Sequence, residues 1–343
     1  MAYSKNQFIP TIALCAILVM ASLDFTGAQT GVCYGRLGNN LPNPSEVVAL
    51  LNQNNIRRVR IYDPHGPTLQ ALSGTNIEVI LGVPNTDLQN VAASQANADT
   101  WVRNNVRNYP NVRFRYIAVG NEVSPVRGDT SQFVSFVLPA LRNIQNAVNS
   151  AGLGGRVRVS TVVETGLIGV SYPPADGAFR PDVASYINPI IRHLVDNRAP
   201  LLANIYPYFS YIGNRAQIDL RYALFTSPDG VVAGGVRYQN LFYAILDSLY
   251  AALERSGGSS LEVVVAESGW PSAGGDTTTV EYARTYNTNL VQRVRNGTPR
   301  RPGRAIETYI FALFDENQKN PEYERHFGVF LPNRQPKYQI SFA

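Results

Sequence analysis

Eight short runs of mostly apolar residues recur along this chain of 343 residues, and segments with helical periodicity lie between them. Most of the runs are continuously apolar, which is typical of parallel strands buried on both faces. Neighbouring parallel strands also need long crossover connections, which the intervening helices provide. We expect the strands at residues 31–34, 59–62, 78–82, 116–120, 157–163, 201–205, 262–266 and 308–314. The chain is therefore predicted to fold as alternating β and α units.

Several of the intervening helices carry recognisable start and stop signals. Asn43-Pro44 combines a favourable N-cap residue with proline at the first helical position. Gly74 is expected to end a short helix over residues 69–73. Pro139 is expected to bend or interrupt a helix over residues 131–149. Further helices are expected at residues 96–108, 182–195, 239–253 and 279–294.

Eight strands separated by helices predict a (β/α)8 TIM barrel, whose active site forms at the carboxyl ends of the strands. A doubly wound open sheet is the alternative, but no glycine-rich phosphate loop follows the first strand. The segment between Ile205 and Arg237 breaks the alternation, because it is rich in tyrosine and phenylalanine and has no strong periodicity. Loops of this length are usually functional. We therefore expect a small extra subdomain in the loop after the sixth strand.

The first 28 residues have the pattern of a secretory signal peptide. Lys5 gives a positive start, residues 12–22 are apolar, and small residues precede Gln29. The apolar stretch is too short to favour a membrane span. We expect cleavage after Ala28, a secreted protein with no membrane association, and a single (β/α)8 catalytic domain over residues 29–343.

Charge and composition argue against several other classes of function. The formal charge is +5 and the isoelectric point is about 9.2, which suits residence among acidic wall polymers. The arginines are scattered without a dense block, so no nucleic-acid partner is expected. His65, His193 and His326 lack the spacing of a metal site, so neither a metal nor a cofactor is expected. Cys33 is the one cysteine beyond the signal segment and is expected to be an inert buried thiol.

Two of the predicted strands end on a glutamate. Glu122 follows the fourth strand, and Glu267 follows the seventh. A buried strand that ends on a carboxylate is costly unless the carboxylate has a function. On a barrel both side chains would point into the same mouth, and paired carboxylates suggest cleavage of a glycosidic bond. Retaining enzymes place the two carboxyl groups about 5–5.5 Å apart and inverting enzymes about 6.5–9.5 Å apart, and the sequence leaves both open.

Five dispersed segments carry a more specific likeness. They are Gly31-Val32-Cys33-Tyr34-Gly35, Arg60-Ile61-Tyr62-Asp63-Pro64, Val119-Gly120-Asn121-Glu122, Glu267-Ser268-Gly269-Trp270-Pro271-Ser272 and Phe314-Asp315-Glu316-Asn317-Gln318-Lys319. In this order they resemble the signature stretches of glycoside hydrolase family 17, and the likeness covers the whole mature chain. The resemblance implies a (β/α)8 barrel and a retaining, double-displacement mechanism.

The resemblance also implies roles for individual residues. Glu122 matches the acid/base of the family, and Glu267 matches its nucleophile. Asn121 is expected to donate to the sugar 2-hydroxyl, a contact that tightens in the transition state. Glu316 and Lys319 match a supporting pair at the end of the eighth strand.

Aromatic side chains are expected to form the platform for the flat faces of the sugar rings. Tyr62, Tyr206, Phe209 and Phe314 match positions of the family and lie at strand ends or in the long aromatic loop. They are predicted to bind substrate. Trp270, next to the nucleophile, is expected to be structural.

Taken with the resemblance, the sequence predicts a secreted endo-hydrolase of β-1,3-glucans that works as a monomer on a polysaccharide substrate. A β-1,3-1,4-glucanase with the same catalytic pair is the nearest alternative. A non-catalytic glucan-binding protein or a transglycosylating wall protein is the alternative from another class. The sequence ends soon after Pro336-Lys337-Tyr338 without the further segment that is associated with vacuolar sorting in some members. We therefore expect the extracellular space as the destination in preference to the vacuole.

Overall fold

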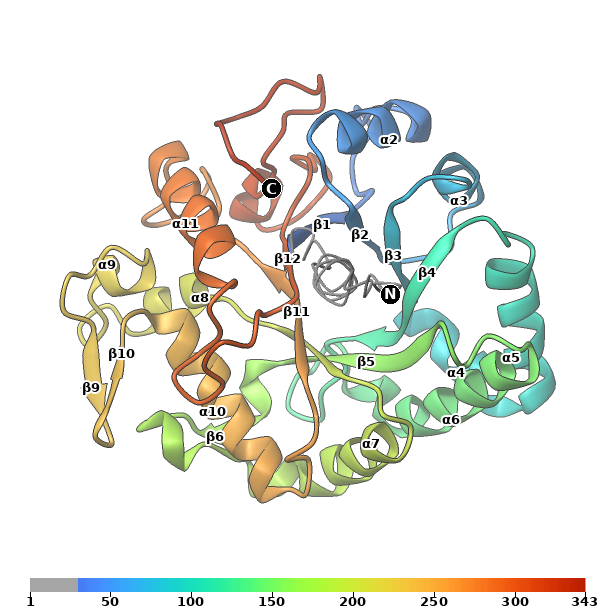
Figure 1. The fold of residues 1–343 in the computed structure, drawn as a ribbon, viewed down its shortest axis with the longest axis horizontal. Coiled ribbons are helices and arrows are strands. Elements are labelled where there is room, and N and C mark those ends of the chain that lie inside the picture. The colour runs from blue at the N-terminus through green and yellow to red at the C-terminus, as the bar shows by residue number, and fades with distance from the viewer. Residues whose placement is uncertain (1–29, 343) are drawn as a thin grey trace, which may run out of the picture.

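The computed structural model describes residues 30–342, and in this range eight parallel strands close into a barrel (Figure 1). The order around the barrel is β1-β12-β11-β8-β5-β4-β3-β2. The barrel strands are β1 (Thr30–Tyr34), β2 (Arg58–Ile61), β3 (Glu78–Val83), β4 (Arg113–Asn121), β5 (Arg158–Glu164), β8 (Leu201–Asn204), β11 (Val263–Ser268) and β12 (Thr308–Ile310). The predicted (β/α)8 barrel is confirmed, and every expected strand is present. The signal segment predicted for residues 1–28 lies outside the described residues.

Two apolar layers, one on each side of the strands, stabilise the barrel. Successive residues of a strand point to opposite faces. One set of side chains, which includes Cys33, Ile80, Val162 and Leu202, therefore fills the interior of the barrel. The alternate set packs outward against the helices. This double burial explains why the strands are continuously apolar in sequence.

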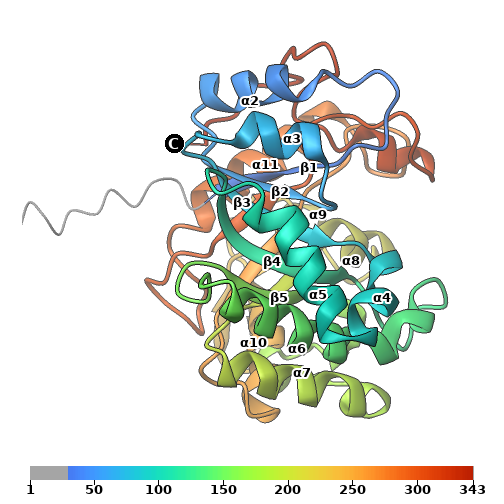
Figure 2. The same ribbon diagram turned by 90° about the vertical axis from the view of Figure 1, so that its right-hand side faces the viewer.

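The helices surround the barrel on the outside, as Figures 1 and 2 show. In Figure 2, α4, α5 and α6 lie together against the outer side of β4 and β5. The helices are α2 (Pro44–Gln53), α3 (Gly66–Leu72), α4 (Leu88–Ala93), α5 (Gln95–Val102), α6 (Val134–Ser150), α7 (Ala184–Asp196), α8 (Pro207–Gly213), α9 (Leu220–Ala223), α10 (Leu241–Arg255) and α11 (Val280–Arg293). The helices expected from the sequence are present within a few residues of their predicted bounds, except the one expected over residues 96–108, whose α-helical part ends at Val102.

Some local features differ from the sequence prediction. Helix α6 continues through Pro139 without a break. Helix α4 was not expected, and the segment predicted as one helix over residues 96–108 consists of α5 followed by a π-helical turn, Arg103–Arg107. The last barrel strand, expected to reach residue 314, ends at Ile310, although the backbone N–H groups of Phe311 and Leu313 still donate to the carbonyls of Ser268 in β11 and Cys33 in β1.

The extra subdomain predicted after the sixth strand is present. It consists of α8, α9 and an antiparallel hairpin of β9 (Val231–Ala233) and β10 (Val236–Tyr238). A second hairpin, β6 (Ile168–Val170) with β7 (Ala178–Phe179), follows β5 and was not predicted. The two additions meet, since a Cβ atom on Gly234 would lie 3.4 Å from the ring of Pro173.

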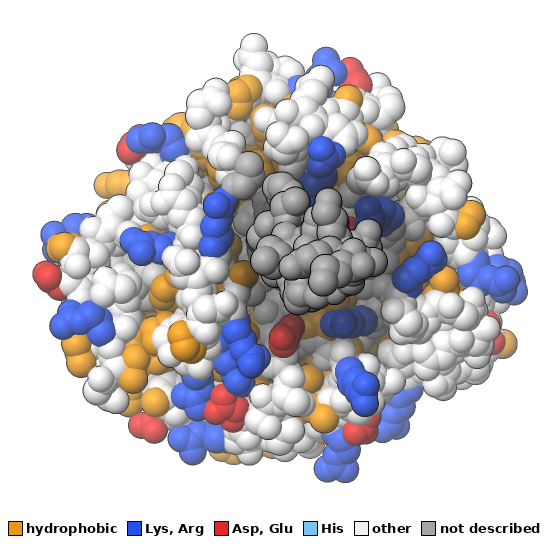
Figure 3. All heavy atoms as spheres, in the orientation of Figure 1, with side chains coloured by type: hydrophobic (Ala, Val, Ile, Leu, Met, Phe, Trp, Pro, Cys, Tyr) orange, Lys and Arg blue, Asp and Glu red, His pale blue; other side chains and the backbone are white. Residues whose placement is uncertain are grey.

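The arrangement of charges and of Cys33 agrees with the composition. On the face seen in Figure 3, lysine and arginine side chains are spread among other residues and form no single block. Within residues 30–342, no helix is long and apolar enough to cross a membrane. Cys33 is fully buried, its thiol lies 3.2 Å from the carbonyl oxygen of Ala266, and burial raises its pKa to about 12. Such a thiol is a poor nucleophile.

The start of α2 provides a test of helix capping. The Asn43 side chain accepts the backbone N–H of Glu46, and the Glu46 carboxylate accepts the backbone N–H of Asn43, which forms a complete capping box. We expect Asn43→Ala to lower the free energy of unfolding by about 1 kcal/mol. Urea denaturation measures this loss. The control Gln53→Ala, at an exposed site in the same helix, should change stability by less than about 0.5 kcal/mol. Equal losses in the two variants would contradict the assignment.

Candidate active site

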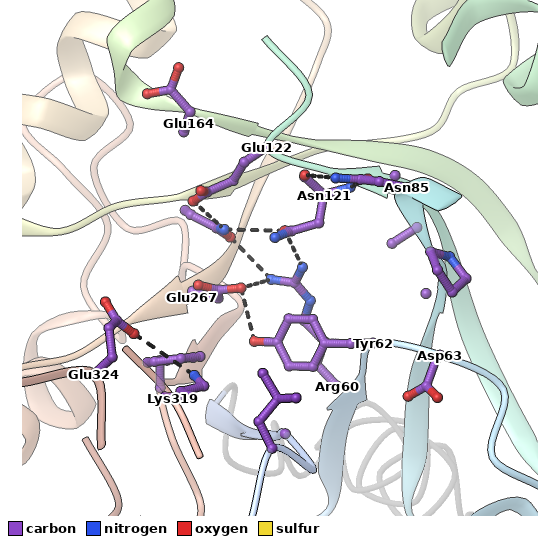
Figure 4. A pocket seen from close by; sticks show the side chains of 18 of the residues that line it. Arg60, Tyr62, Asp63, Asn85, Asn121, Glu122, Glu164, Glu267, Lys319 and Glu324 are labelled. Carbon is purple, nitrogen blue, oxygen red and sulfur yellow. Dashed lines mark hydrogen bonds and ion pairs between the residues drawn. The ribbon is translucent and has the colours of Figure 1, made fainter. Parts of the chain in front are cut away.

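A cleft of about 750 Å³ lies at the carboxyl ends of the barrel strands. Both predicted catalytic glutamates line it: Glu122 directly follows β4, and Glu267 is the penultimate residue of β11. They are 145 positions apart in the sequence, and the closure of the barrel brings them into one cavity (Figure 4). The prediction that the two strand ends share one mouth is confirmed.

The Glu267 carboxylate is held by three hydrogen-bond donors. Its Oε1 accepts from Arg60 Nη1 and from the Tyr62 hydroxyl, both at 2.8 Å. Its Oε2 accepts from the Tyr206 hydroxyl at 2.7 Å. Glu267 is only 6% exposed, so these contacts replace the water that an exposed carboxylate would bind. Donors from three directions stabilise the negative charge and fix the orientation of the carboxylate.

Arg60 connects most of the polar groups at the base of the cleft. It is 2% exposed, although it lies between the apolar residues Val59 and Ile61 in β2. Besides Glu267, its guanidinium donates to the side-chain oxygen of Asn121 at 2.6 Å (Figure 4). It also donates to the side-chain oxygen of Asn204 at 3.1 Å. A buried arginine is tolerated when its charge is paired and its donors are satisfied.

Glu122 has a different environment. Its backbone has φ +50°, which is uncommon for a residue other than glycine and is often found at functional sites. Its Oε1 accepts from Asn204 Nδ2 at 2.8 Å, and its Oε2 pairs with Arg127. Burial and the nearby charge of Glu267 raise the pKa of Glu122, and the hydrogen bond from Asn204 and the charge of Arg127 oppose the increase. A raised pKa suits a general acid.

The two carboxylates are therefore linked but differ in character. Asn204 donates to Glu122 and accepts from Arg60, which in turn binds Glu267, so a single chain of hydrogen bonds joins them. Glu267 is enclosed by donors, and burial together with the charge of Glu267 raises the pKa of Glu122. Different environments for two neighbouring carboxylates are the arrangement that acid–base chemistry on a glycosidic bond requires.

Comparison with known proteins agrees with this geometry. A model of the family described as glycosyl hydrolases family 17 matches residues 30–342. The chain belongs to glycosyl hydrolases family 17. The resemblance seen in the sequence motifs is confirmed, and with it the conclusion that the protein is a glycoside hydrolase.

Similar members of glycosyl hydrolases family 17 come from several plants. The glucan endo-1,3-beta-glucosidase of Vitis vinifera is 55% identical over 346 residues, which covers 100% of both chains. The basic vacuolar isoform of glucan endo-1,3-beta-glucosidase from Nicotiana plumbaginifolia is 56% identical over 99% of this chain and 94% of its own. The solved structure of CJP38, a beta-1,3-glucanase and allergen of Cryptomeria japonica pollen, has a TM-score of 0.90 at 47% identity. That match covers 92% of this chain and 99% of CJP38.

The expected supporting pair, Glu316 and Lys319, lies in the loop after β12, and both residues line the cleft. Lys319 Nζ is 3.2 Å from a Glu316 carboxylate oxygen and 4.2 Å from the centroid of the Phe311 ring. Glu316 also accepts the backbone N–H of Leu37 at 2.7 Å. A Cβ atom on Gly35 would lie 2.4 Å from this carboxylate, so the close approach needs glycine. The pair thus ties the loop after β12 to the loop after β1.

The predicted aromatic residues have different positions. Tyr62, Tyr206 and Phe209 line the cleft, and Phe209 is 40% exposed. The hydroxyls of Tyr62 and Tyr206 bind Glu267, so both residues also orient the carboxylate. Phe314 does not reach the cleft. It is 3% exposed and packs edge-on against Tyr34, whereas Phe311, three residues earlier, lines the cleft.

Trp270, expected to be structural, is fully buried. Its ring packs against Tyr208 and Tyr286, and its indole N–H donates to the carbonyl oxygen of Thr277.

Several residues of the site were missed in the sequence. Arg60 and Asn204 could have been identified from the sequence as residues of the site. Like the two glutamates, each is a polar residue within or at the end of a buried strand. Arg127 lies in a loop and Glu324 in the 3₁₀ helix Glu322–His326, and no local pattern in the sequence marks either position as part of a site. Glu324 lines the cleft 3.8 Å from Lys319, and burial raises its pKa to about 7 against the opposing charge of Lys319. Within residues 30–342, no group of three or more His, Cys, Asp or Glu side chains could hold a metal ion.

The buried ion pair between Arg60 and Glu267 provides a test of the site's energetics. We expect Arg60→Met to lower the free energy of unfolding by about 3–5 kcal/mol, because it leaves a buried carboxylate without its counterion. Urea denaturation is the measurement. Arg158→Met, at an exposed position with no side-chain partner among the described residues, is the control and should cost less than about 0.5 kcal/mol. A loss below about 1 kcal/mol in Arg60→Met would show that the pair is not the main charge compensation.

Proposed function

We propose that this glycosyl hydrolase is a retaining endo-1,3-β-glucosidase that cleaves β-1,3-glucans by double displacement. The observation that carries the proposal is the placement of Glu122 and Glu267 in one cleft with contrasting environments. The linkage is supported by the relatives, which are named as glucan endo-1,3-beta-glucosidases and are more than half identical over nearly the full chain.

In the first step Glu122 is the general acid. Burial and the charge of Glu267 raise its pKa, so it can hold a proton near the working pH and pass it to the leaving glycosidic oxygen. Glu267 attacks the anomeric carbon and forms the covalent glycosyl-enzyme intermediate. Its donors, Arg60, Tyr62 and Tyr206, hold the carboxylate in one orientation during the attack.

In the second step Glu122, now ionised, takes a proton from a water molecule that attacks the same carbon from the side of the departed sugar. Glu267 is released, and the two inversions together retain the anomeric configuration. Asn121 is assigned to the sugar 2-hydroxyl. Its side-chain oxygen accepts from Arg60, which leaves its amide N–H groups for the sugar.

The remaining parts of the proposal concern substrate binding and location. Phe209 and Phe311 are assigned to the sugar faces, and Glu316 and Lys319 to the support of the cleft wall. We propose that the signal segment directs the protein to the extracellular space, where it acts as a monomer on callose, fungal wall glucan or laminarin. The vacuole is the alternative, because a similar relative is a basic vacuolar isoform.

A β-1,3-1,4-glucanase with the same two glutamates remains the second candidate, since the shape of the cleft loops decides the linkage. A binding or transglycosylating wall protein is the third. Glu122 and Glu267 both line the cleft with their partners in place, which favours hydrolysis over binding alone.

Release of reducing sugar tests reaction and linkage together. The wild type should hydrolyse a β-1,3-glucan faster than a mixed-linkage β-glucan. Glu267→Gln should fall below a few per cent of that activity and still bind the glucan, because the amide keeps the shape and loses the nucleophile. The control Glu262→Gln changes an exposed glutamate just before the same strand and should behave as wild type. Retained activity in Glu267→Gln would refute the nucleophile, and a preference for the mixed-linkage polymer would establish the second candidate.

The stereochemistry is tested by proton NMR of the first products. We expect the new reducing end to appear first as the β-anomer and to equilibrate later, since double displacement retains configuration. The spectrum should be recorded before mutarotation is complete. Initial appearance of the α-anomer would mean an inverting mechanism, in which Glu267 activates water and forms no covalent intermediate.

A further inference from the structure

The loop between β4 and α6 brings a positive charge onto the proposed acid. Arg127 lines the cleft, and its guanidinium pairs with Oε2 of Glu122. The other carboxylate oxygen, Oε1, already accepts from Asn204. Arginine has donors and no acceptor, and this asparagine also presents its amide N–H. Neither partner can therefore accept a proton from Glu122, so the arrangement in the structure fits the ionised form of the acid.

The proton-donating step needs the opposite state. One oxygen of Glu122 must carry a proton and face the glycosidic oxygen. The Oε2 atom is covered by Arg127, and Oε1 is bound to the buried Asn204, which is 2% exposed and also held by Arg60. Arg127 must therefore leave Oε2 before Glu122 can act as an acid through this oxygen.

The surroundings of Arg127 allow this movement. Its side chain is 38% exposed, compared with 2% for Arg60 and 15% for Lys319. Asp129, two residues further on, binds the same guanidinium through Nε at 3.2 Å and Nη2 at 2.9 Å and is itself 62% exposed. Asp129 can keep the charge paired after Arg127 has left Glu122.

The backbone of the loop is fixed, so the movement is confined to the side chain. The Thr130 hydroxyl donates to the carbonyl oxygen of Glu122 at 3.0 Å and accepts the backbone N–H of Ser124 at 3.2 Å. The backbone N–H of Ser131 donates to the carbonyl oxygen of Arg127 at 2.8 Å. These contacts tie the loop to the backbone of Glu122.

Other charged groups also act on Glu122, but from the walls of the cleft. Glu267 in β11 and Glu164 at the end of β5 oppose its negative charge. Arg60 reaches it through Asn204, and Lys319 and Glu324 face the cleft from the loop after β12.

Two of these charged groups, Arg60 and Lys319, are held in their present positions. Arg60 is buried, and Lys319 is held between Glu316 and Glu324. Tyr62 and Tyr206 are engaged with Glu267 and do not contact Glu122 in the structure. Arg127 is the one cation in the described residues that contacts Glu122 directly and has a second, exposed acidic partner.

We propose that Arg127 is a displaceable counterion of the acid: it holds Glu122 ionised in the free enzyme and moves off when a glucan chain fills the cleft. Glu122 then takes up a proton from the solvent as the substrate binds. Arg127 is thus a positioning residue that couples occupation of the cleft to the protonation of Glu122. This inference rests on the proposed role of Glu122 as the acid.

The pH dependence of the two steady-state constants tests the proposal. The basic limb of kcat/KM reports the acid in the free enzyme, and the basic limb of kcat reports it in the complex. In Arg127→Met the free acid loses its counterion, so its pKa rises and the basic limb of kcat/KM should move to higher pH by about 0.2–0.7 unit. The basic limb of kcat should stay in place, because Arg127 has already left in the complex.

Two further variants make the test specific. Arg127→Lys keeps the charge and should retain most of the wild-type profile. Arg180→Met is the matched control, since Arg180 binds Asp182 two residues on with the same two contacts, at 2.9 and 2.7 Å, and does not line the cleft. The pH profiles of kcat/KM and of kcat in Arg180→Met should equal those of the wild type.

The outcomes separate this inference from the proposed function. If the basic limb of kcat/KM has the same pH in Arg127→Met as in the wild type, Arg127 does not act on the acid. If the basic limbs of kcat/KM and of kcat shift equally, Arg127 is not displaced from Glu122 when substrate binds. Either result overturns the proposal and leaves the proposed function intact. Glu122→Gln tests that function separately: the basic limb should disappear along with most of the activity, and an active variant that keeps the limb would remove Glu122 as the acid.

Discussion

The buried ion pair between Arg60 and Glu267 is the interaction on which the site depends. Both side chains lie within strands of a closed barrel and are nearly buried at the base of the cleft, so each charge is compensated mainly by the other and by neighbouring amide and hydroxyl groups. The pair also positions the rest of the site. Arg60, which binds Glu267, also orients Asn121 and Asn204, and Asn204 in turn binds Glu122. A buried carboxylate at this position is thus accompanied by a buried cation and two amides around it.

The barrel gives two identical side chains different chemistry. Glu267 has a guanidinium and a phenol donor on Oε1 and a phenol donor on Oε2, whereas Glu122 stands where its strand ends, with one buried amide and one partly exposed arginine as partners. Burial disfavours the charged form of Glu122 and raises its pKa, which is what the proposed role as an acid needs. The difference arises from position in the fold and from neighbours contributed by five different strands and loops.

The additions to the barrel complete the cleft. The subdomain after β8 contributes Phe209, and the loop after β12 contributes Lys319 and Glu324. These segments have little periodicity, and their conformations depend on contacts with one another. Tyr206, for example, packs against both Phe209 and Phe327, which are far apart in the chain. Loops of this kind on a rigid barrel are where linkage preference is decided.

The sequence by itself determined the eight barrel strands in chain order, most of the helices between them and the two glutamates, because buried parallel strands must be continuously apolar and a charge that ends such a strand is conspicuous. The same rule, applied to Arg60 and Asn204, would have revealed the partners of the glutamates. Tertiary structure alone decided that Phe311 faces the cleft and Phe314 the core, because the chain beyond Ile310 pairs with the distant segment around Phe327 and Phe330. It alone placed Arg127 and Glu324, since a charged residue in a polar segment outside the barrel strands has no local signal until the fold shows which group it faces.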